Sequence, residues 1–206
     1  MQTMRKRSAW RCAVFFAFAL LAASSASAAS STPLPRGTFA VIPARSDVRA
    51  RVSSTLHDFD VEAKVYRGEA VISRDSGNPV QLFVEFRVKE MVSGNFMRDQ
   101  VMRSDVFEDA RYPLVRFRSE KISLAGTGPE GSLRFQAEGT LNMHGVEKNQ
   151  IISIFVSPGG DRILARAEFP LRISDYGMKV PSPLPFLHTE DVVKVTVRIV
   201  LHPGGD

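Results

Sequence analysis

Alternation of apolar and polar residues recurs along most of residues 37–203 and limits the fold of this chain more than any other feature. Period-two alternation is typical of a β-strand with one buried face, because successive side chains point to opposite sides of a sheet. Five segments alternate cleanly: 48–52, 80–89, 133–143, 162–172 and 193–201. Three further segments alternate less regularly: 60–74, 113–124 and 147–156. The pattern predicts about eight strands in a single all-β domain.

Turn-forming residues separate these segments. The segments 75–79 (DSGNP), 126–131 (GTGPEG) and 157–161 (SPGGD), together with His144-Gly145, have the composition of turns and loops. Short connections of this kind join antiparallel neighbours, whereas parallel strands need long crossovers. We therefore expect a mostly antiparallel sheet.

Two segments do not fit a strand. In 95–109, apolar residues recur at three-to-five spacing between charged ones, which predicts a short amphipathic helix that ends before Tyr112-Pro113. Its apolar cluster, Phe96, Met97, Met102 and Phe107, either plugs one end of the core or lines a ligand entrance. Segment 175–188 contains three prolines and predicts an extended loop before the last strand.

Eight one-sided strands can bury their apolar faces in a sandwich or in a closed barrel. Several runs reach 10–13 residues, roughly 33–43 Å at about 3.3 Å per residue, which favours an up-and-down barrel. Such a barrel is either filled by its own side chains or holds one small ligand. A solid, tapering core is one alternative. The other is a cavity, for which small inward residues leave room: Ala50, Ala70, Ala137, Gly139, Ala165 and Ala167. The charged outward faces argue against an outer-membrane barrel.

The first thirty residues have the order of a secretory signal peptide. A basic cluster precedes an apolar run over 13–23, and Ala26-Ser27-Ala28 fits a cleavage site. An uncleaved membrane anchor within 12–35 is the alternative, but its second half is weakly apolar. Cleavage after Ala28 predicts a flexible segment 29–36 and a periplasmic or secreted domain.

The basic pI of about 9.7 and net charge of +5 favour a nucleic-acid partner at first sight. Four basic residues and no acidic ones lie in 1–28, however, so cleavage leaves 23 basic and 22 acidic residues, a net charge of +1. We therefore expect no nucleic-acid partner. Cys12, the only cysteine, leaves with the signal, which excludes disulfides from the mature chain.

No motif for catalysis or metal binding is present. The four histidines lack ligand spacing, and the chain has no nucleophile elbow, P-loop or dinucleotide fingerprint. We expect no enzyme activity, cofactor or metal. His57 is most simply an edge residue and His144 a turn residue that bonds to the backbone, while Arg98-Asp99 is most simply a pair on the helix surface. Alternatively, Arg98 faces an anionic head group at a barrel mouth.

Several of these residues form a known pattern. The strongest match is GTLNMHGVEK at 139–148, against a family pattern G-x-L-T-I-H-G-V-T-K; Arg98-Asp99 with Met102, Tyr112-Pro113 with Phe117, and SDYGM at 174–178 are the others. On these motifs the chain resembles the YceI-like family of secreted bacterial proteins, also called polyisoprenoid-binding proteins. The resemblance spans about 39–202. Asn142 and Glu147 replace family threonines, which leaves the ligand's identity open.

The resemblance implies an eight-stranded, lipocalin-like antiparallel barrel over 37–203, with the helix of about 95–109 near one end. It also implies a binding protein that holds an isoprenoid lipid, either a polyprenyl phosphate or a quinone, in an apolar tunnel. We expect Arg98 and His144 at the polar end. The expected ligand-binding residues are Leu82, Val84, Phe86, Phe96, Met97, Arg98, Met102, Phe107, Phe117, Phe135, Met143, His144 and Phe169.

Four further expectations stay open at this point. A stress-related structural barrel without a specific ligand is the main alternative function, and an enzyme acting on a small apolar substrate is a weaker one, because no acid–base pair is clustered. Transient contact with a membrane is compatible with a lipid ligand. A homodimer is equally compatible with the sequence.

Overall fold

The computed structural model describes residues 33–179 and 188–204. The expected signal peptide, and most of the proline-rich part of 175–188, lie outside the described residues. The described residues form nine strands: β1 (Gly37–Val41), β2 (Asp47–Val52), β3 (Phe59–Ile72), β4 (Pro79–Arg87), β5 (Leu114–Thr127), β6 (Leu133–Met143), β7 (Val146–Gly159), β8 (Arg162–Arg172) and β9 (Val192–Pro203). The eight predicted segments correspond to β2–β9, with ends that differ by up to three residues.

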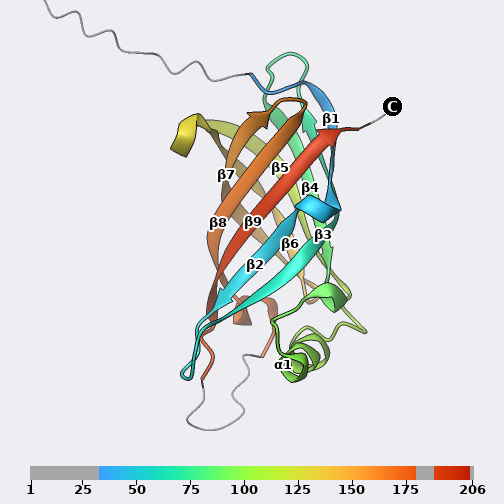
Figure 1. The fold of residues 1–206 in the computed structure, drawn as a ribbon, viewed down its shortest axis with the longest axis vertical. Coiled ribbons are helices and arrows are strands. Elements are labelled where there is room, and N and C mark those ends of the chain that lie inside the picture. Colours follow the sequence, from blue (N-terminus) through green and yellow to red (C-terminus); the bar gives the residue numbers. More distant parts are fainter. Residues whose placement is uncertain (1–32, 180–187, 205–206) are drawn as a thin grey trace, which may run out of the picture.

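The strands form one closed antiparallel barrel (Figure 1). Each strand from β3 to β8 pairs with the next along the chain, and β9 pairs back to β1 and β2. β1 and β2 occupy one position between β3 and β9, interrupted by the 3-10 turn Pro43–Arg45, so the wall has eight strand positions. The eight-stranded barrel is thus confirmed, and the sandwich is excluded.

The start of the barrel differs from the expectation. β1 was not expected, because Phe39, Ala40 and Val41 form a short apolar run without alternation. It is a strand because β3 and β9 both offer it backbone partners. Leu34, within the segment expected to be flexible, is only 3% exposed and belongs to the core. The packed structure therefore begins before residue 37.

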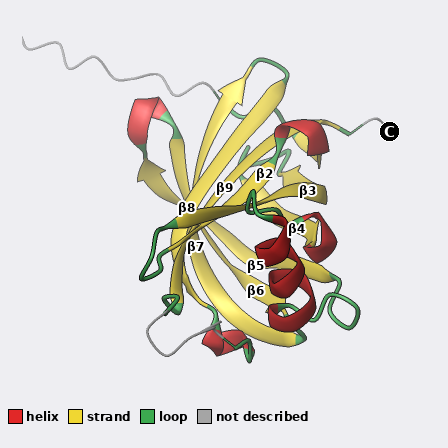
Figure 2. Cartoon of the chain, turned by 60° about the horizontal axis from the view of Figure 1, so that its bottom comes forward, coloured by secondary structure: helices red, strands yellow, loops and turns green. Residues whose placement is uncertain are grey.

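The predicted helix is present and lies at one end of the barrel, the lower end in Figure 1. α1 (Phe96–Val101) is capped by Asn95, whose side chain accepts a hydrogen bond from the Arg98 backbone N–H at 3.1 Å. A π-helical turn over Met102–Val106 extends it. Figure 2 shows these turns over one side of that end of the strands.

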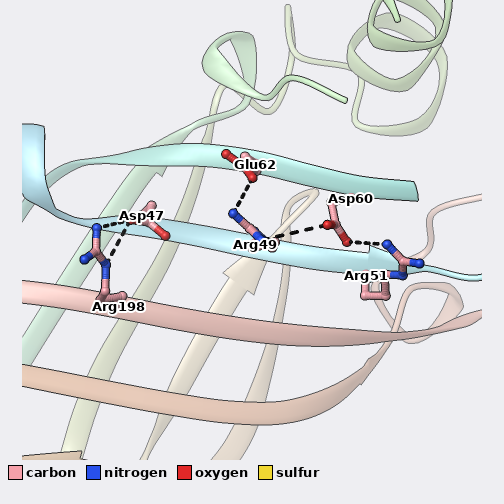
Figure 3. A network of polar contacts seen from close by, with 6 residues as sticks. All are labelled: Asp47, Arg49, Arg51, Asp60, Glu62 and Arg198. Carbon is pink, nitrogen blue, oxygen red and sulfur yellow. Dashed lines mark hydrogen bonds and ion pairs between the residues drawn. The ribbon is translucent and has the colours of Figure 1, made fainter. Parts of the chain in front are cut away.

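Charged residues of opposite sign face each other across the outer surface of β2, β3 and β9 (Figure 3). Arg49 lies opposite Glu62 in the strand register, with their side chains 2.6 Å apart, and Arg198 lies opposite Asp47 at 3.1 Å. These side chains are well exposed, so each pair contributes at most about 1 kcal/mol. The arrangement follows from alternation, which gives every inward apolar residue a polar outward neighbour.

Glu85, on the outer face of β4, is the most deeply buried charged residue of the described chain, at 1% exposure. Its carboxylate accepts hydrogen bonds from Arg116 Nε at 2.6 Å and Arg67 Nε at 2.9 Å. Burial opposes its ionisation, but the hydrogen bonds and charges of the two arginines outweigh burial and hold the pKa of Glu85 below its usual value. Glu85 therefore joins three adjacent strands, β3, β4 and β5.

Candidate functional site

An apolar cavity of about 890 Å³ occupies the α1 end of the barrel interior. Such a volume is near the upper end of the range of about 300–1,000 Å³ found for small-molecule sites. On β9 its wall runs from Val193 to Ile199, about 20 Å along the strand at 3.3 Å per residue. The solid-core expectation is therefore wrong for this half of the barrel.

The opposite end of the barrel is filled by side chains. Phe39, Ile72, Phe135 and Ile163 are almost fully buried there, and none of them lines the cavity. On β3, β6 and β9 alike, wall residues lie toward α1 and packed residues toward the chain termini. The cavity is thus a blind tunnel that ends on this packed layer.

Small residues account for the cavity only in part. Ala50, Ala165 and Ala167 line it as expected. Ala70, Ala137 and Gly139 lie in the packed half instead. A side chain at Gly139 would lie 2.2 Å from the Arg118 carbonyl oxygen, so this glycine serves the close approach of β5 to β6 rather than leaving space inside.

Ten of the thirteen expected ligand-binding residues line the cavity: Leu82, Val84, Phe86, Met97, Arg98, Met102, Phe107, Phe117, Met143 and Phe169. They come from β4, β5, β6, β8 and the α1 segment, so the barrel brings together positions up to 87 residues apart in sequence. Their contact with a ligand stays a prediction.

Phe96, Phe135 and His144 do not line the cavity. Phe96 projects outward from the start of α1 and is 76% exposed. Phe135 does point inward, as its alternation requires, but it lies in the packed half. His144 lies outside the wall because its ring is held by neighbouring loops.

His144 and Gly145 form the two-residue turn between β6 and β7. Both have positive φ, +53° and +74°, which fits a type I′ hairpin turn. His144 Nδ1 lies 3.2 Å from the Tyr176 carbonyl oxygen, its Nε2 lies 3.3 Å from Glu108 Oε1 without the alignment of a hydrogen bond, and its ring packs against Tyr112. The imidazole thus joins three loops and is not a head-group donor at the cavity.

Tyr176 is itself fully buried beside this turn. Its hydroxyl accepts a hydrogen bond from Gln150 Nε2 at 3.0 Å. Burial raises the pKa of the Tyr176 phenol, so the hydroxyl stays protonated at neutral pH. Tyr176 and His144 thus hold the β6–β7 turn against the loop after β8.

Arg98 is at the cavity mouth, where α1 faces β3. Its guanidinium stacks on Phe59, with Cζ 3.9 Å from the ring centroid, and donates through Nε to Ser93 Oγ at 2.8 Å and through Nη2 to Ser93 O at 2.9 Å. The Ser93 hydroxyl in turn donates to Asp99, which is buried. The expected surface pair between Arg98 and Asp99 is therefore wrong, because Ser93 lies between the two charges.

This network fixes the guanidinium without using all of its donors. Ser93 is the one hydrogen-bond acceptor of the Arg98 side chain among the described residues, and it takes two of the five guanidinium N–H groups. Three N–H groups remain for an anionic or carbonyl group at the mouth.

Sequence reasoning missed other polar residues that line the mouth: Ser54, Thr55, His57, Asp105, Lys179, His188 and Thr189. His188 O accepts hydrogen bonds from Thr55 N at 2.9 Å and Thr55 Oγ1 at 3.0 Å, which fastens the end of the β8–β9 loop to the β2–β3 hairpin. These contacts span 133 residues, so no local sequence signal indicates them.

Within residues 33–179 and 188–204, no cluster of three or more His, Cys, Asp or Glu side chains is placed to hold a metal ion. Over the same residues, no helix is long and apolar enough to cross a membrane.

Known proteins share this architecture. Residues 39–201 match the sequence profile of the YceI-like domain. BcnA of Burkholderia cenocepacia is 20% identical (TM-score 0.62; 78% of this chain and 98% of that one covered), and a polyisoprenoid-binding domain from Saccharophagus degradans, implicated in plant cell wall breakdown, is 15% identical (TM-score 0.62; 82% and 100%). The YceI protein of Campylobacter jejuni is 16% identical (TM-score 0.53; 69% and 85%).

No curated protein sequence matches the chain. The structural likenesses show the fold alone, since every identity is at most 20%. The profile match extends over most of the chain and over the whole barrel from β1 to β9. The chain therefore belongs to the YceI-like family.

Proposed function

We propose that this protein is an exported, periplasmic binding protein that holds an isoprenoid lipid in the barrel cavity. The observation that carries the proposal is the apolar tunnel of about 890 Å³ with an ordered arginine at its mouth. A polyisoprenoid-binding domain shares the fold, which supports an isoprenoid over other apolar ligands. Periplasmic location rests on the signal-like sequence of residues 1–28.

The energetics suit a long apolar tail. Each buried methylene contributes about 0.8 kcal/mol, and the tunnel wall consists almost wholly of aliphatic, aromatic and methionine side chains. Ordering a flexible tail costs conformational freedom, so the affinity is well below the sum of these terms. Methionines at the α1 end, Met97 and Met102, adapt to an irregular chain.

We assign the ligand's head group to the mouth, with Arg98 as its donor. A phosphate accepts hydrogen bonds from these N–H groups in which donor and acceptor are both charged. A quinone carbonyl is a neutral acceptor for the same N–H groups. Lys179 also lines the mouth and adds positive charge for a phosphate. The protein acts by binding and carrying, without catalysis, and meets its lipid at a membrane.

Organic extraction of the purified mature protein, followed by mass spectrometry, tests the ligand class. A co-purifying prenyl lipid supports the proposal. A clean extract from several expression hosts, together with no uptake of added prenyl lipid, refutes it in favour of a barrel without a specific ligand.

Arg98→Ala tests the head-group assignment. Hydrogen bonds to a charged group are worth about 1.5–3 kcal/mol, so binding of a prenyl phosphate should weaken at least about tenfold. Binding of the prenyl alcohol with the same tail should change much less. Arg162→Ala, at an exposed position on the far end of β8, is the control. Equal losses for phosphate and alcohol would show that Arg98 supports the wall rather than the head group.

A further inference from the structure

Exposed apolar side chains gather around the cavity mouth. Phe96, Leu56 and Met97 are 76%, 70% and 68% exposed, and they are three of the four most exposed large apolar residues of the described chain. Val92, Val101 and Val192 are exposed at the same end of the barrel. We call these six residues the mouth rim. The other exposed apolar residues, such as Ile151, lie along the barrel wall and at its opposite end.

The rim comes from four separate segments, one of which is the loop before α1 that carries Val92. Leu56 is at the tip of the β2–β3 hairpin, Phe96, Met97 and Val101 belong to α1, and Val192 begins β9. The hairpin and α1 project from the same end of the barrel, on opposite sides of it, in Figure 1. A large apolar side chain left in water is unfavourable, and a cluster of them marks an interaction surface.

The rim is continuous with the cavity. Leu56, Met97 and Val101 are exposed on the outside and also line the tunnel. An apolar path therefore leads from the tunnel floor across the mouth to the outer surface. A lipid tail that left a bilayer through water would lose the burial of every methylene, at about 0.8 kcal/mol each.

Charged residues near the mouth are of both signs. Arg51 pairs with Asp58 and Asp60, whereas Arg98 and Arg103 donate to neutral acceptors and keep their charge. The six rim side chains are all uncharged, so insertion of apolar side chains, rather than attraction to an anionic surface, is the driving force that we infer.

We propose that the mouth rim docks on a lipid bilayer, with Phe96, Leu56 and Met97 inserted at the interface, so that the tunnel opens directly into hydrocarbon. The inference rests on the proposed function, since the ligand is the lipid that would pass. A protein partner seated on the same ring would close the mouth with its own surface. A bilayer leaves the apolar path continuous, which is why it is the preferred occupant.

Flotation with zwitterionic phosphatidylcholine vesicles tests the docking. The wild-type mature protein should float with vesicles, and high salt should change this little. Phe96→Asp should weaken partitioning at least about tenfold, because burying a phenylalanine is worth about 1.5–3 kcal/mol. Ile151→Asp, at a similarly exposed apolar position on β7, should float like the wild type.

A second measurement separates this proposal from the proposed function. Phe96 does not line the cavity, so Phe96→Asp should bind a fluorescent isoprenoid alcohol in solution with unchanged affinity while taking it up from vesicles more slowly. If the alcohol binds but the wild type does not float, or if Ile151→Asp fails to float as well, docking is refuted and the lipid-binding function stands. If the wild type floats and no isoprenoid binds, docking on a bilayer stands and the proposed lipid-binding function is refuted. The wild type could instead self-associate without floating, and Phe96→Asp could abolish that association. This result would assign the rim to a second copy of the chain and overturn the proposal.

Discussion

The division of the barrel into an open and a packed half predicts opposite outcomes for one substitution at two sites. Ala167 on β8 and Ala137 on β6 both point inward, and both are buried. Ala167 lines the cavity, between Ile154 and Val197 on the neighbouring strands, whereas Ala137 is fully buried in the packed half. Alanine-to-phenylalanine substitution at each position therefore measures whether space is present there.

At Ala167 the added ring enters existing space. A benzene molecule fits a cavity of about 150 Å³, so the ring occupies roughly one sixth of the 890 Å³ available. The ring displaces about one isoprene unit of tail, which corresponds to at most about 4 kcal/mol at 0.8 kcal/mol per methylene. The displaced part regains freedom at the mouth, so we expect ligand affinity to fall about 10- to 100-fold with little loss of stability.

At Ala137 the same ring has no space. Overpacking a close-packed core costs typically about 1–3 kcal/mol, and a whole ring at a fully buried site lies at the upper end or beyond. Chemical denaturation measures the free energy of unfolding, and titration with a fluorescent isoprenoid alcohol measures affinity. A destabilised Ala167→Phe with a stable Ala137→Phe would refute the division into open and packed halves. Unchanged ligand affinity in a folded Ala167→Phe would exclude the tunnel as the binding site.

Two further predictions concern stability. Glu85→Gln should lower the free energy of unfolding by about 1–2 kcal/mol at pH 7, since it removes charged hydrogen bonds to Arg67 and Arg116. This value is below the sum for two charged hydrogen bonds, because both arginine side chains are exposed and water screens their charge. Because folding lowers the pKa of Glu85, the stabilisation by its carboxylate is complete above the unfolded-state pKa of about 4.5 and is lost as pH falls through the folded-state pKa. The denaturation curves of variant and wild type should therefore converge in acid. A constant difference in the free energy of unfolding down to pH 3 would contradict this. Gly145→Ala should destabilise the barrel by more than about 1 kcal/mol, because the residue has φ +74° and an added Cβ would lie 2.5 Å from the Tyr112 ring. The melting temperature of the variant measures this loss of stability, and Gly160→Ala, at a position of equal φ with no atoms nearby, is the control. An equal fall in melting temperature for both variants would show that backbone strain alone causes the loss.

The strands were predictable because alternation and turn composition are local. The boundaries of 133–143 coincide with β6, since the turns on both sides are unambiguous. β1 was missed, because its five residues become a strand only when β3 and β9 pair with them. The helix was recognised from its spacing, and its cap at Asn95 follows from the preference of asparagine for that position.

The candidate site was predictable in its inward-facing apolar residues and not in its polar ones. Leu82, Val84 and Phe86 line the cavity because alternation fixes their face. No local pattern indicated that Ser93 would separate Arg98 from Asp99, or that the His144 ring would lie between Tyr176 and Glu108. The His144 contacts join loops that come together only when the barrel closes, whereas the Ser93 contacts are local and depend on the backbone path of the segment before α1.

The sequence by itself determined which side chains face the interior, because the two-residue period of a strand is a property of the backbone. Only the tertiary structure decided how deep each inward residue lies and whether space remains beside it. Phe135 and Phe169 have the same pattern around them, yet Phe135 packs the closed end and Phe169 lines the tunnel. Depth depends on where each strand lies along the barrel axis and on which loops cover its end, and neither is encoded in alternation.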